Sequence, residues 1–258
     1  MAIVNLTPDS FYDGGKYDSI EDILADAEQK VKAGADILDL GAASSRQGSE
    51  EISTEEEWKR LEKPLKEIRS KFPEIIISVD TYRAEIAKKA AENGADIIND
   101  ISGGNADQNM LETMVNLNLP YVMMHMQGTP KTMQQNPTYN NVVKEIIAEF
   151  TSKINFLEPK GFKKIILDPG FGFGKNTEHN YTLLKHLNEF CKLDYPVMAG
   201  VSRKSMINSI LKTNPVTALN GTTIVNTIAL LNGAKIVRVH DVTEAKQAVE
   251  IVQYYNNL

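Results

Sequence analysis

Short apolar runs of strand length alternate with longer amphipathic segments of helix length along the whole chain. Glycine, proline and asparagine separate the two kinds of segment, as they do where strands and helices end. The pattern predicts eight strands, over Ala2–Leu6, Asp36–Leu40, Glu74–Val79, Asp96–Asn99, Pro120–His125, Ile165–Asp168, Pro196–Gly200 and Lys235–Val239. It also predicts helices over Ser19–Lys32, Ala84–Glu92, Asp107–Leu117, Asn140–Leu157 and Thr177–Phe190, and others that start at Ser53, after Ser202, at Pro215 and after Asp241.

Residues at three of the predicted helix starts support these boundaries. Ser53 precedes Glu56 by three residues and Asp241 precedes Glu244 by three, which is the spacing of a capping box. Pro215 suits the first turn of a helix, where no backbone N–H is needed. We therefore expect helices to begin at these positions.

One kind of segment recurs: a helix end, a glycine and a buried strand that closes on a polar residue. Lys32–Asp39, Glu92–Asn99 and Leu231–Arg238 are copies, and Lys160–Asp168 is a looser one. Eight such units in 258 residues predict an α/β fold, a (β/α)8 TIM barrel that forms a single domain over residues 1–258. A doubly wound open sheet is the alternative, but no Gly-x-Gly-x-x-Gly follows the first strand. Because Met1 lies almost directly on the first strand, we expect no N-terminal hairpin to plug the bottom of the barrel.

Composition narrows the class of protein. The net charge is -6, so we expect no general attraction to nucleic acid or to an anionic membrane, and any anion site must be local. No apolar run approaches the length of a membrane span, and no signal peptide is predicted. The one cysteine, Cys191, excludes an internal disulfide and favours a reducing cytoplasm. No cluster of histidine, cysteine and aspartate has the spacing of a zinc site.

Polar residues follow nearly every predicted strand. In a TIM barrel the carboxyl ends of the strands meet at one rim, where the chemistry takes place. Acid and amide groups there suit a flat heterocycle with several N–H and C=O edges, and basic groups suit a phosphate or a carboxylate. The acid and amide set is Asp80, Asn99 and Asp168, and the basic set is Arg203, Lys204, Arg238 and His240. The sequence therefore predicts a heterocycle pocket beside an anion pocket.

Several of these residues have simpler interpretations. Asp168 precedes Pro169 and a run of glycines, so it could be a surface acid in a tight turn. Asp39 lies inside a strand, and we expect it to face a neighbouring element. His125 stands among methionines, which favours packing over a role as a base. His179 and His186 lie in or beside a helix, and we expect them at the surface.

With these residues placed, the chain resembles the dihydropteroate synthase family of the folate pathway. The resemblance covers nearly the whole chain. Its motifs are Asn5–Gly15, Ser78–Thr81, Ile98–Gly104, Met124–Gly128, Leu167–Lys175, Gly200–Lys204 and Arg238–His240. It implies an enzyme that condenses 6-hydroxymethyl-7,8-dihydropterin diphosphate with 4-aminobenzoate to give 7,8-dihydropteroate and pyrophosphate. It also implies a homodimer and inhibition by sulfonamides.

The resemblance implies a role for individual residues. Asp80, Asp168, Lys204 and Arg238 would be catalytic. The pterin diphosphate would be bound by Asn5, Ser45, Asp80, Asn99, Ile101, Met124, Asp168, Phe173, Gly200, Lys204, Arg238 and His240. The aminobenzoate site would contain Phe11, Ser45, Arg46, Ser202 and Lys204. The cofactor would be Mg²⁺, bound near Asn5.

We expect pyrophosphate to leave before the amine attacks. Basic groups and Mg²⁺ would neutralise the leaving diphosphate, and Asp80 and Asp168 would stabilise a cationic pterin-methylene group. The loops Thr7–Lys16 and Ala42–Glu51 would close and exclude water. In the second loop Gln47 stands where the family commonly has proline, which affects the expected ordering of this loop and aminobenzoate affinity.

Two other functions fit parts of the sequence. A pterin-dependent corrinoid methyltransferase would share the acid and amide contacts, but it has less need of the basic residues. The presence of Asn5, Lys204 and Arg238 counts against a non-catalytic pterin-binding protein. Release of pyrophosphate from the two substrates distinguishes a synthase from both.

Overall fold

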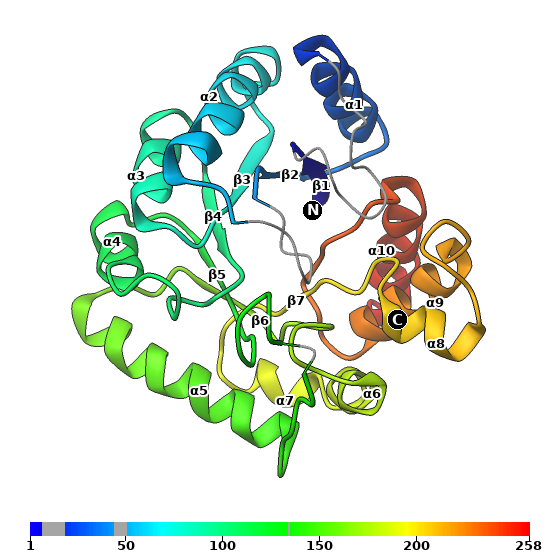
Figure 1. The fold of residues 1–258 in the computed structure, drawn as a ribbon. Coiled ribbons are helices and arrows are strands. Elements are labelled where there is room, and N and C mark those ends of the chain that lie inside the picture. The colour runs from blue at the N-terminus through cyan, green and yellow to red at the C-terminus, as the bar shows by residue number, and fades with distance from the viewer. Residues whose placement is uncertain (7–18, 44–50, 134) are drawn as a thin grey trace.

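The strands form a closed parallel barrel (Figure 1). The computed structural model describes residues 1–6, 19–43, 51–133 and 135–258. Six strands pair in chain order: β1 (Ala2–Asn5), β2 (Ile37–Gly41), β3 (Ile76–Asp80), β4 (Ile97–Asp100), β5 (Tyr121–Met124) and β6 (Ile165–Asp168). The short strands β7 (Met198–Ala199) and β8 (Ile236–Val237) pair with each other.

Backbone hydrogen bonds join this pair to both edges of the six-stranded sheet. Leu167 N–H donates to Pro196 O at 2.9 Å on the β6 side. Ile3 N–H donates to Val239 O at 3.0 Å on the β1 side. Because both edges are paired, the eight strands close into the predicted (β/α)8 barrel.

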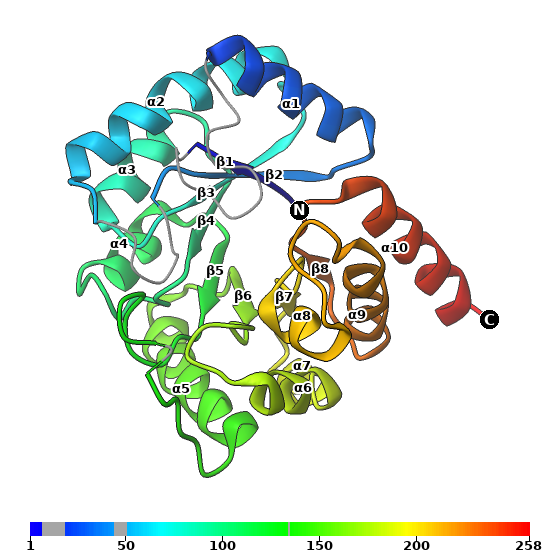
Figure 2. The same ribbon diagram turned by 45° about the vertical axis from the view of Figure 1, so that its right-hand side comes forward.

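Helices surround the barrel (Figures 1 and 2). In the described residues they are α1 (Ile20–Lys32), α2 (Thr54–Lys71), α3 (Ala84–Glu92), α4 (Met110–Leu117), α5 (Val142–Leu157), α6 (Thr177–Lys185), α7 (Asn188–Cys191), α8 (Ser205–Leu211), α9 (Leu219–Leu231) and α10 (Val242–Asn256). A short 3-10 turn, Glu158–Lys160, follows α5. None of these helices is long and apolar enough to cross a membrane.

Two predicted helices have different bounds. The helix predicted over Thr177–Phe190 is broken, because His186 leaves the helical conformation and separates α6 from α7. The helix predicted from Pro215 begins at Leu219. The Asn214 side chain accepts hydrogen bonds from the backbone N–H groups of Val216 and Thr217, which forms a turn before the helix.

The predicted capping boxes form only in part. The Ser53 hydroxyl accepts from Glu56 N–H at 3.2 Å, but the Glu56 carboxylate binds Arg60 instead of returning to the cap. At the start of α10, Asp241 makes no side-chain cap and binds Arg203. Spacing alone did not reveal these competing partners.

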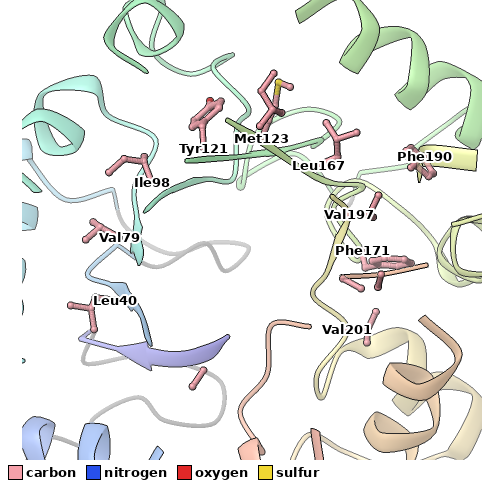
Figure 3. Close-up of a cluster of buried hydrophobic side chains, with 14 of the residues drawn as sticks. Leu40, Val79, Ile98, Tyr121, Met123, Leu167, Phe171, Phe190, Val197 and Val201 are labelled. Atoms are coloured by element: carbon pink, nitrogen blue, oxygen red, sulfur yellow. The ribbon is translucent and has the colours of Figure 1, made fainter. Parts of the chain in front are cut away.

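Alternate side chains along each strand separate two apolar layers. Outward-facing residues such as Leu40, Val79, Ile98 and Leu167 pack against the helices (Figure 3). Inward-facing residues fill the lower part of the barrel; they are Met1, Ile37, Ile97, Val122, Ile166 and Met198, with Ile236 packed against them. Each such side chain stabilises the fold by about 1.5–3 kcal/mol when it is removed from water.

The inward-facing layer also places the polar residues. Side chains two positions apart on a strand share a face, so the next inward position lies nearer the carboxyl end. Those next positions are Asp39 after Ile37, Asn99 after Ile97, Asp168 after Ile166, Gly200 after Met198 and Arg238 after Ile236. The apolar layer is therefore a floor beneath a polar layer at the barrel mouth.

Candidate active site

Arg238, which directly follows β8, is the centre of one half of the polar layer. Its Nε donates to Asp39 Oδ2 at 2.6 Å, and its Nη2 donates to Asp80 Oδ2 at 2.9 Å. These bonds link β8 to β2 and β3 across the barrel mouth. The guanidinium is consequently held in one orientation by two carboxylates.

Asp39 is fully buried and anchors this arrangement. Besides the Arg238 guanidinium, its carboxylate accepts from the Ser78 hydroxyl at 2.5 Å and from the Asn99 amide at 3.1 Å. Asp39 does face neighbouring strands, as we expected, but those neighbours are themselves site residues. It therefore positions Arg238 and Asn99.

The strand register aligns four residues in one row near the mouth. Asn5 is paired with Gly41, Gly41 with Asp80, and Asp80 with Asn99. A Cβ at Gly41 would lie 3.6 Å from Asp80 Cβ and 3.9 Å from Asn5 Oδ1. The glycine thus leaves the space between an amide oxygen and a carboxylate open.

Asp168 and Lys204 form the opposite wall. Asp168 ends β6, is buried, and accepts from Gly170 N–H at 2.8 Å. Lys204 Nζ donates to Phe171 O at 2.5 Å and lies 4.6 Å from the centre of the Phe173 ring. The backbone of Phe171 and the ring of Phe173 therefore fix the ammonium group from two sides.

Gly200 keeps the space between these two groups clear. A Cβ there would lie 3.8 Å from both Asp168 Oδ2 and Lys204 Nζ, and 3.9 Å from Arg238 Cβ. The absence of a side chain leaves open the space between the Asp168 carboxylate, the Lys204 ammonium and the base of the Arg238 side chain. Gly200 therefore lies among the residues predicted to bind the pterin diphosphate, and its role there stays a prediction.

Burial shifts the pKa values of the two acids, Asp80 and Asp168, and of the Lys204 amine. It raises the pKa of Asp80 to about 7, with the Arg238 guanidinium acting in the opposite direction. It also raises the pKa of Asp168, opposed mainly by the Lys204 ammonium. It lowers the pKa of Lys204 to about 8. Such perturbed groups facing one space are typical of an active site.

His240 and Ser202 form a pair beside Arg238. Ser202 Oγ lies 2.9 Å from His240 Nδ1 and also accepts from His240 N–H at 3.2 Å. Burial, followed by the charge of Arg238, lowers the pKa of His240 to about 3, so the ring is neutral. The prediction of a positively charged His240 is therefore wrong. A neutral imidazole keeps one N–H, so His240 can still donate a hydrogen bond although it carries no charge.

Arg203 also departs from its predicted role. Its Nε and Nη2 bind Asp241 at 2.9 and 2.6 Å, and its Nη1 donates to the carbonyls of Pro215 and Val216. The residue is buried. Through the bonds to Asp241, its guanidinium joins the loop after β7 to the start of α10. The prediction that Arg203 offers its charge to an anion is wrong, because its guanidinium is already paired with the Asp241 carboxylate. The sequence around Arg203 does not reveal this partner.

Apolar residues of the predicted pocket also gather at this end. Ile101 and Met124 are buried, directly after β4 and at the end of β5. A cavity of about 270 Å³ opens between the segments that follow β2 to β5, and its lining includes Ile101, Tyr82 and Met126. Met124 follows Val122 by two positions on β5 and therefore shares its inward face.

Some predicted residues cannot be placed. Phe11, Ser45, Arg46 and Gln47 lie outside the described residues. The predicted loops Thr7–Lys16 and Ala42–Glu51 fall largely or wholly there too, so their closure stays a prediction.

The other histidines and the cysteine differ in how far they are buried. His125 is buried, and burial lowers its pKa to about 3, which agrees with a packing role. His186 is exposed, whereas His179 is partly buried, contacts the Tyr139 ring and takes part in the cap of α6. Cys191 is partly buried beside Gly233, and burial raises the pKa of its thiol.

Three contacts that position side chains in this region were not predicted from the sequence. Ser78 and Asn99 bind Asp39, and Lys175 binds His125. Ser78 and Asp80 share the inward face of β3, so strand alternation could have found the first contact. Nothing in the sequence pairs Lys175 with a histidine 50 positions away.

The oxygen atoms at the barrel mouth could bind a cation such as Mg²⁺ only if a substrate phosphate completed the coordination. Among the described residues, no group of three or more His, Cys, Asp or Glu side chains could hold a metal ion. The oxygens of Asn5 and Asp80 flank the space above Gly41. Such amide and carboxylate oxygens fit Mg²⁺, which proteins commonly bind with one or two side chains and the substrate's phosphates.

Residues 1–240 match the sequence model of a family described as pterin binding enzyme. The chain belongs to this family. Within it, the dihydropteroate synthase of Escherichia coli strain K12 is 44% identical over 255 residues, a match that covers 98% of this chain and 90% of the relative.

Two solved structures of pterin-binding enzymes share the fold. The dihydropteroate synthase of Yersinia pestis, solved with a sulfonamide drug, is 39% identical with a TM-score of 0.96, covering 100% of this chain and 94% of that chain. The enzyme of Xanthomonas albilineans in complex with 7,8-dihydropteroate is 34% identical with a TM-score of 0.87, covering 100% and 93%. These likenesses confirm the TIM barrel.

Proposed function

We propose that this chain is a dihydropteroate synthase, a transferase of folate biosynthesis. It condenses 6-hydroxymethyl-7,8-dihydropterin diphosphate with 4-aminobenzoate and yields 7,8-dihydropteroate and pyrophosphate. The observation that carries this proposal is the convergence of Asp80, Asp168, Lys204 and Arg238 on one space, in a chain 44% identical to a curated dihydropteroate synthase. We further propose that residues 1–258 act as a single catalytic domain.

The pterin ring binds between the two walls of the mouth. Asp80, Asn99 and Asp168 offer carboxylate and amide groups to the N–H and C=O edges of the heterocycle. Lys204 donates to a ring acceptor, and Ile101, Met124 and Phe173 cover the faces. Burial of the acids supports this role, because hydrogen bonds to charged groups are stronger where water is excluded.

The diphosphate binds across the rim from Asp168. Arg238 supplies the positive charge, and neutral His240 donates a hydrogen bond. Mg²⁺, held by Asn5 and the diphosphate itself, would neutralise further charge on the leaving group. Asp39 keeps the Arg238 guanidinium in place during the reaction.

In the reaction, the bond between the pterin methylene carbon and the diphosphate oxygen breaks, and the electron pair leaves with pyrophosphate. The ionised carboxylates of Asp80 and Asp168 stabilise the cationic methylene group. The amine nitrogen of aminobenzoate then forms a bond to that carbon and loses a proton. No covalent enzyme intermediate is required.

The aminobenzoate site lies on the Lys204 side of the mouth. Ser202, with Phe11, Ser45 and Arg46 of the two loops, contributes to it. Because Ser202 Oγ is already bonded to His240, the two substrate sites share a hydrogen bond. We propose that sulfonamides compete with aminobenzoate here, and that Gln47 affects how the second loop covers them.

We also propose a cytoplasmic homodimer. Exposed apolar side chains gather on the last three helices, which lie next to one another (Figures 1 and 2). They are Ile210 and Leu211 of α8, Ile224, Ile228 and Leu231 of α9, and Ile251, Tyr254 and Tyr255 of α10. A surface of this kind favours association with a second apolar surface.

Pyrophosphate release distinguishes this function from its rivals. Purified protein is mixed with the pterin diphosphate, 4-aminobenzoate and Mg²⁺, and pyrophosphate is measured over time. A synthase releases it, whereas a corrinoid methyltransferase or a non-catalytic binding protein does not.

Lys204→Ala should lower turnover by about a hundredfold or more without unfolding the barrel. A Lys204→Ala variant with near-normal activity would remove Lys204 from the site.

A further inference from the structure

Lys175 is a buried lysine that contacts no carboxylate at hydrogen-bond distance within the described residues. It closes the glycine segment after β6 and is 3% exposed. Its Nζ lies 3.0 Å from His125 Nδ1, 3.3 Å from His125 O and 2.9 Å from Phe173 O. Burial lowers the pKa of Lys175 to about 7, opposed mainly by the charge of Asp168. In its protonated form the side chain has three N–H donors, and these three acceptors match that number.

His125 has the protonation state that this arrangement requires. Its low pKa keeps the ring neutral, so Nδ1 can accept from Lys175 while Nε2 carries the proton. Nε2 lies 3.4 Å from Glu149 Oε2 on α5. Glu149 is in turn bound by Lys153 at 2.6 Å and by Asn105 at 3.0 Å. The histidine is therefore oriented from both sides.

Lys175 joins two segments that approach each other very closely. Gly170 has φ +72°, and a Cβ there would lie 1.9 Å from His125 O. Gly174 has φ +63°, and a Cβ there would lie 2.5 Å from Gln127 O. Glycine permits this contact, but it does not fasten one segment to the other. The Lys175 ammonium does so, because it binds the His125 carbonyl on one segment and the Phe173 carbonyl on the other.

The fastened segment carries the groups that hold Lys204. The carbonyl of Phe171 accepts from Lys204 Nζ, and the ring of Phe173 lies beside it. We propose that Lys175 is a positioning residue for the pterin pocket: by fixing the glycine segment against His125, it fixes the two groups that orient Lys204. This inference rests on the proposed role of Lys204 in binding the pterin.

The test compares two lysines of one hydrogen-bond network. Lys175→Met removes the proposed fastening, and Lys153→Met removes a lysine that binds Glu149 at the outer end of the network. Binding of 6-hydroxymethylpterin is measured by calorimetry, and steady-state kinetics are measured for both substrates. Thermal unfolding shows whether each variant is folded.

We expect Lys175→Met to lower kcat/KM for the pterin diphosphate by about tenfold or more, since displaced groups lose much of their effect. Pterin affinity should fall in parallel, because Lys204 donates to the pterin ring in the proposed site. Lys153→Met should stay within about twofold of the wild type on every measure, because it does not contact the glycine segment. Unchanged pterin affinity in a folded Lys175→Met variant would overturn the proposal.

A second variant pair tests whether Lys175 acts through Lys204. In a Lys204→Ala background, Lys175→Met should weaken pterin binding by less than about threefold, because the orienting groups have lost their target. If the loss of pterin affinity in the double variant equals the product of the two single-variant losses, the proposal is contradicted. If Lys175→Met does not fold, Lys175→Gln, which keeps two donors, replaces it. If both fail to fold, Lys175 serves the fold alone and the proposal is wrong.

Calorimetry separates this inference from the proposed reaction. A wild-type protein that binds the pterin but releases no pyrophosphate contradicts the synthase function, while the Lys175 variants still decide the positioning role. Unchanged pterin binding in Lys175→Met, with normal pyrophosphate release by the wild type, contradicts the positioning role alone.

Discussion

At the scale of single residues, the site depends on charged groups held away from water. Asp39 receives three donors at full burial, and one of them is the guanidinium of Arg238. Buried charges of this kind stabilise a structure only when each has its partner. The chemistry and the stability of the mouth are therefore linked at this residue.

Asp39→Asn should reduce both stability and activity. The amide is neutral and leaves Arg238 with one charged partner, so the free energy of unfolding should fall by about 3 kcal/mol. Urea unfolding and kcat/KM for the pterin diphosphate measure the two effects. Glu62→Gln, at the exposed ion pair with Lys66, is the control and should change stability by less than about 0.5 kcal/mol. An Asp39→Asn protein as stable and active as the control would refute this role.

The pH dependence follows from two shifted groups. Asp80 acts ionised, so kcat/KM should fall as the pH drops through its pKa of about 7. Lys204 acts protonated, so kcat/KM should fall as the pH rises through its pKa of about 8. A plot of kcat/KM for the pterin diphosphate against pH should thus be a narrow bell. A flat profile across this range would show that neither group titrates in the free enzyme.

At the scale of elements, the apolar pattern of the strands was enough to predict the barrel and the polar residues at its mouth. The predicted strand boundaries placed Asp80 and Asp168 at the carboxyl ends of strands, and the barrel brought those ends together. Partners from distant segments could not be predicted, because nothing local pairs Arg203 with Asp241 or Lys175 with His125. Those pairings depend on how the loops fold over the rim.

The glycine segment after β6 offers a test of such a long-range contact. Gly170 and Gly161 both have positive φ, but a Cβ at Gly161 would have no neighbour within 4 Å. Gly161→Ala should therefore cost only the backbone strain, about 1 kcal/mol. Gly170→Ala adds the collision with His125 O and should cost about 3 kcal/mol or more beyond that. Urea unfolding compares them, and similar losses for both would show that the close approach is unimportant.

At the scale of the whole molecule, the barrel leaves one side rich in apolar surface. Ile224, Ile228 and Leu231 recur at helical spacing on α9, and each is more than a third exposed. These side chains lie on one of the helices that surround the barrel, whereas the polar layer lies at the barrel mouth. The proposed dimer and the proposed chemistry would therefore use different surfaces of the same chain.

Ile224→Glu should convert the proposed dimer into single chains. A charge at this position would be buried on association and would oppose it. Sedimentation or light scattering should give a mass of two chains for the wild type and 28.7 kDa for the variant. Phe156→Glu, at an exposed apolar residue of α5, should leave the dimer intact. A wild type of single-chain mass would contradict the dimer.

In the proposed function, the polar layer at the barrel mouth joins a pterin to an aromatic amine. The most direct measurement is the joint amount of pyrophosphate and 7,8-dihydropteroate formed from the two substrates with Mg²⁺, the second identified by its mass. We predict that wild type forms both in equal amounts, and that Lys204→Ala forms almost none of either. Pyrophosphate without dihydropteroate, or neither product from folded wild-type protein, would contradict the account.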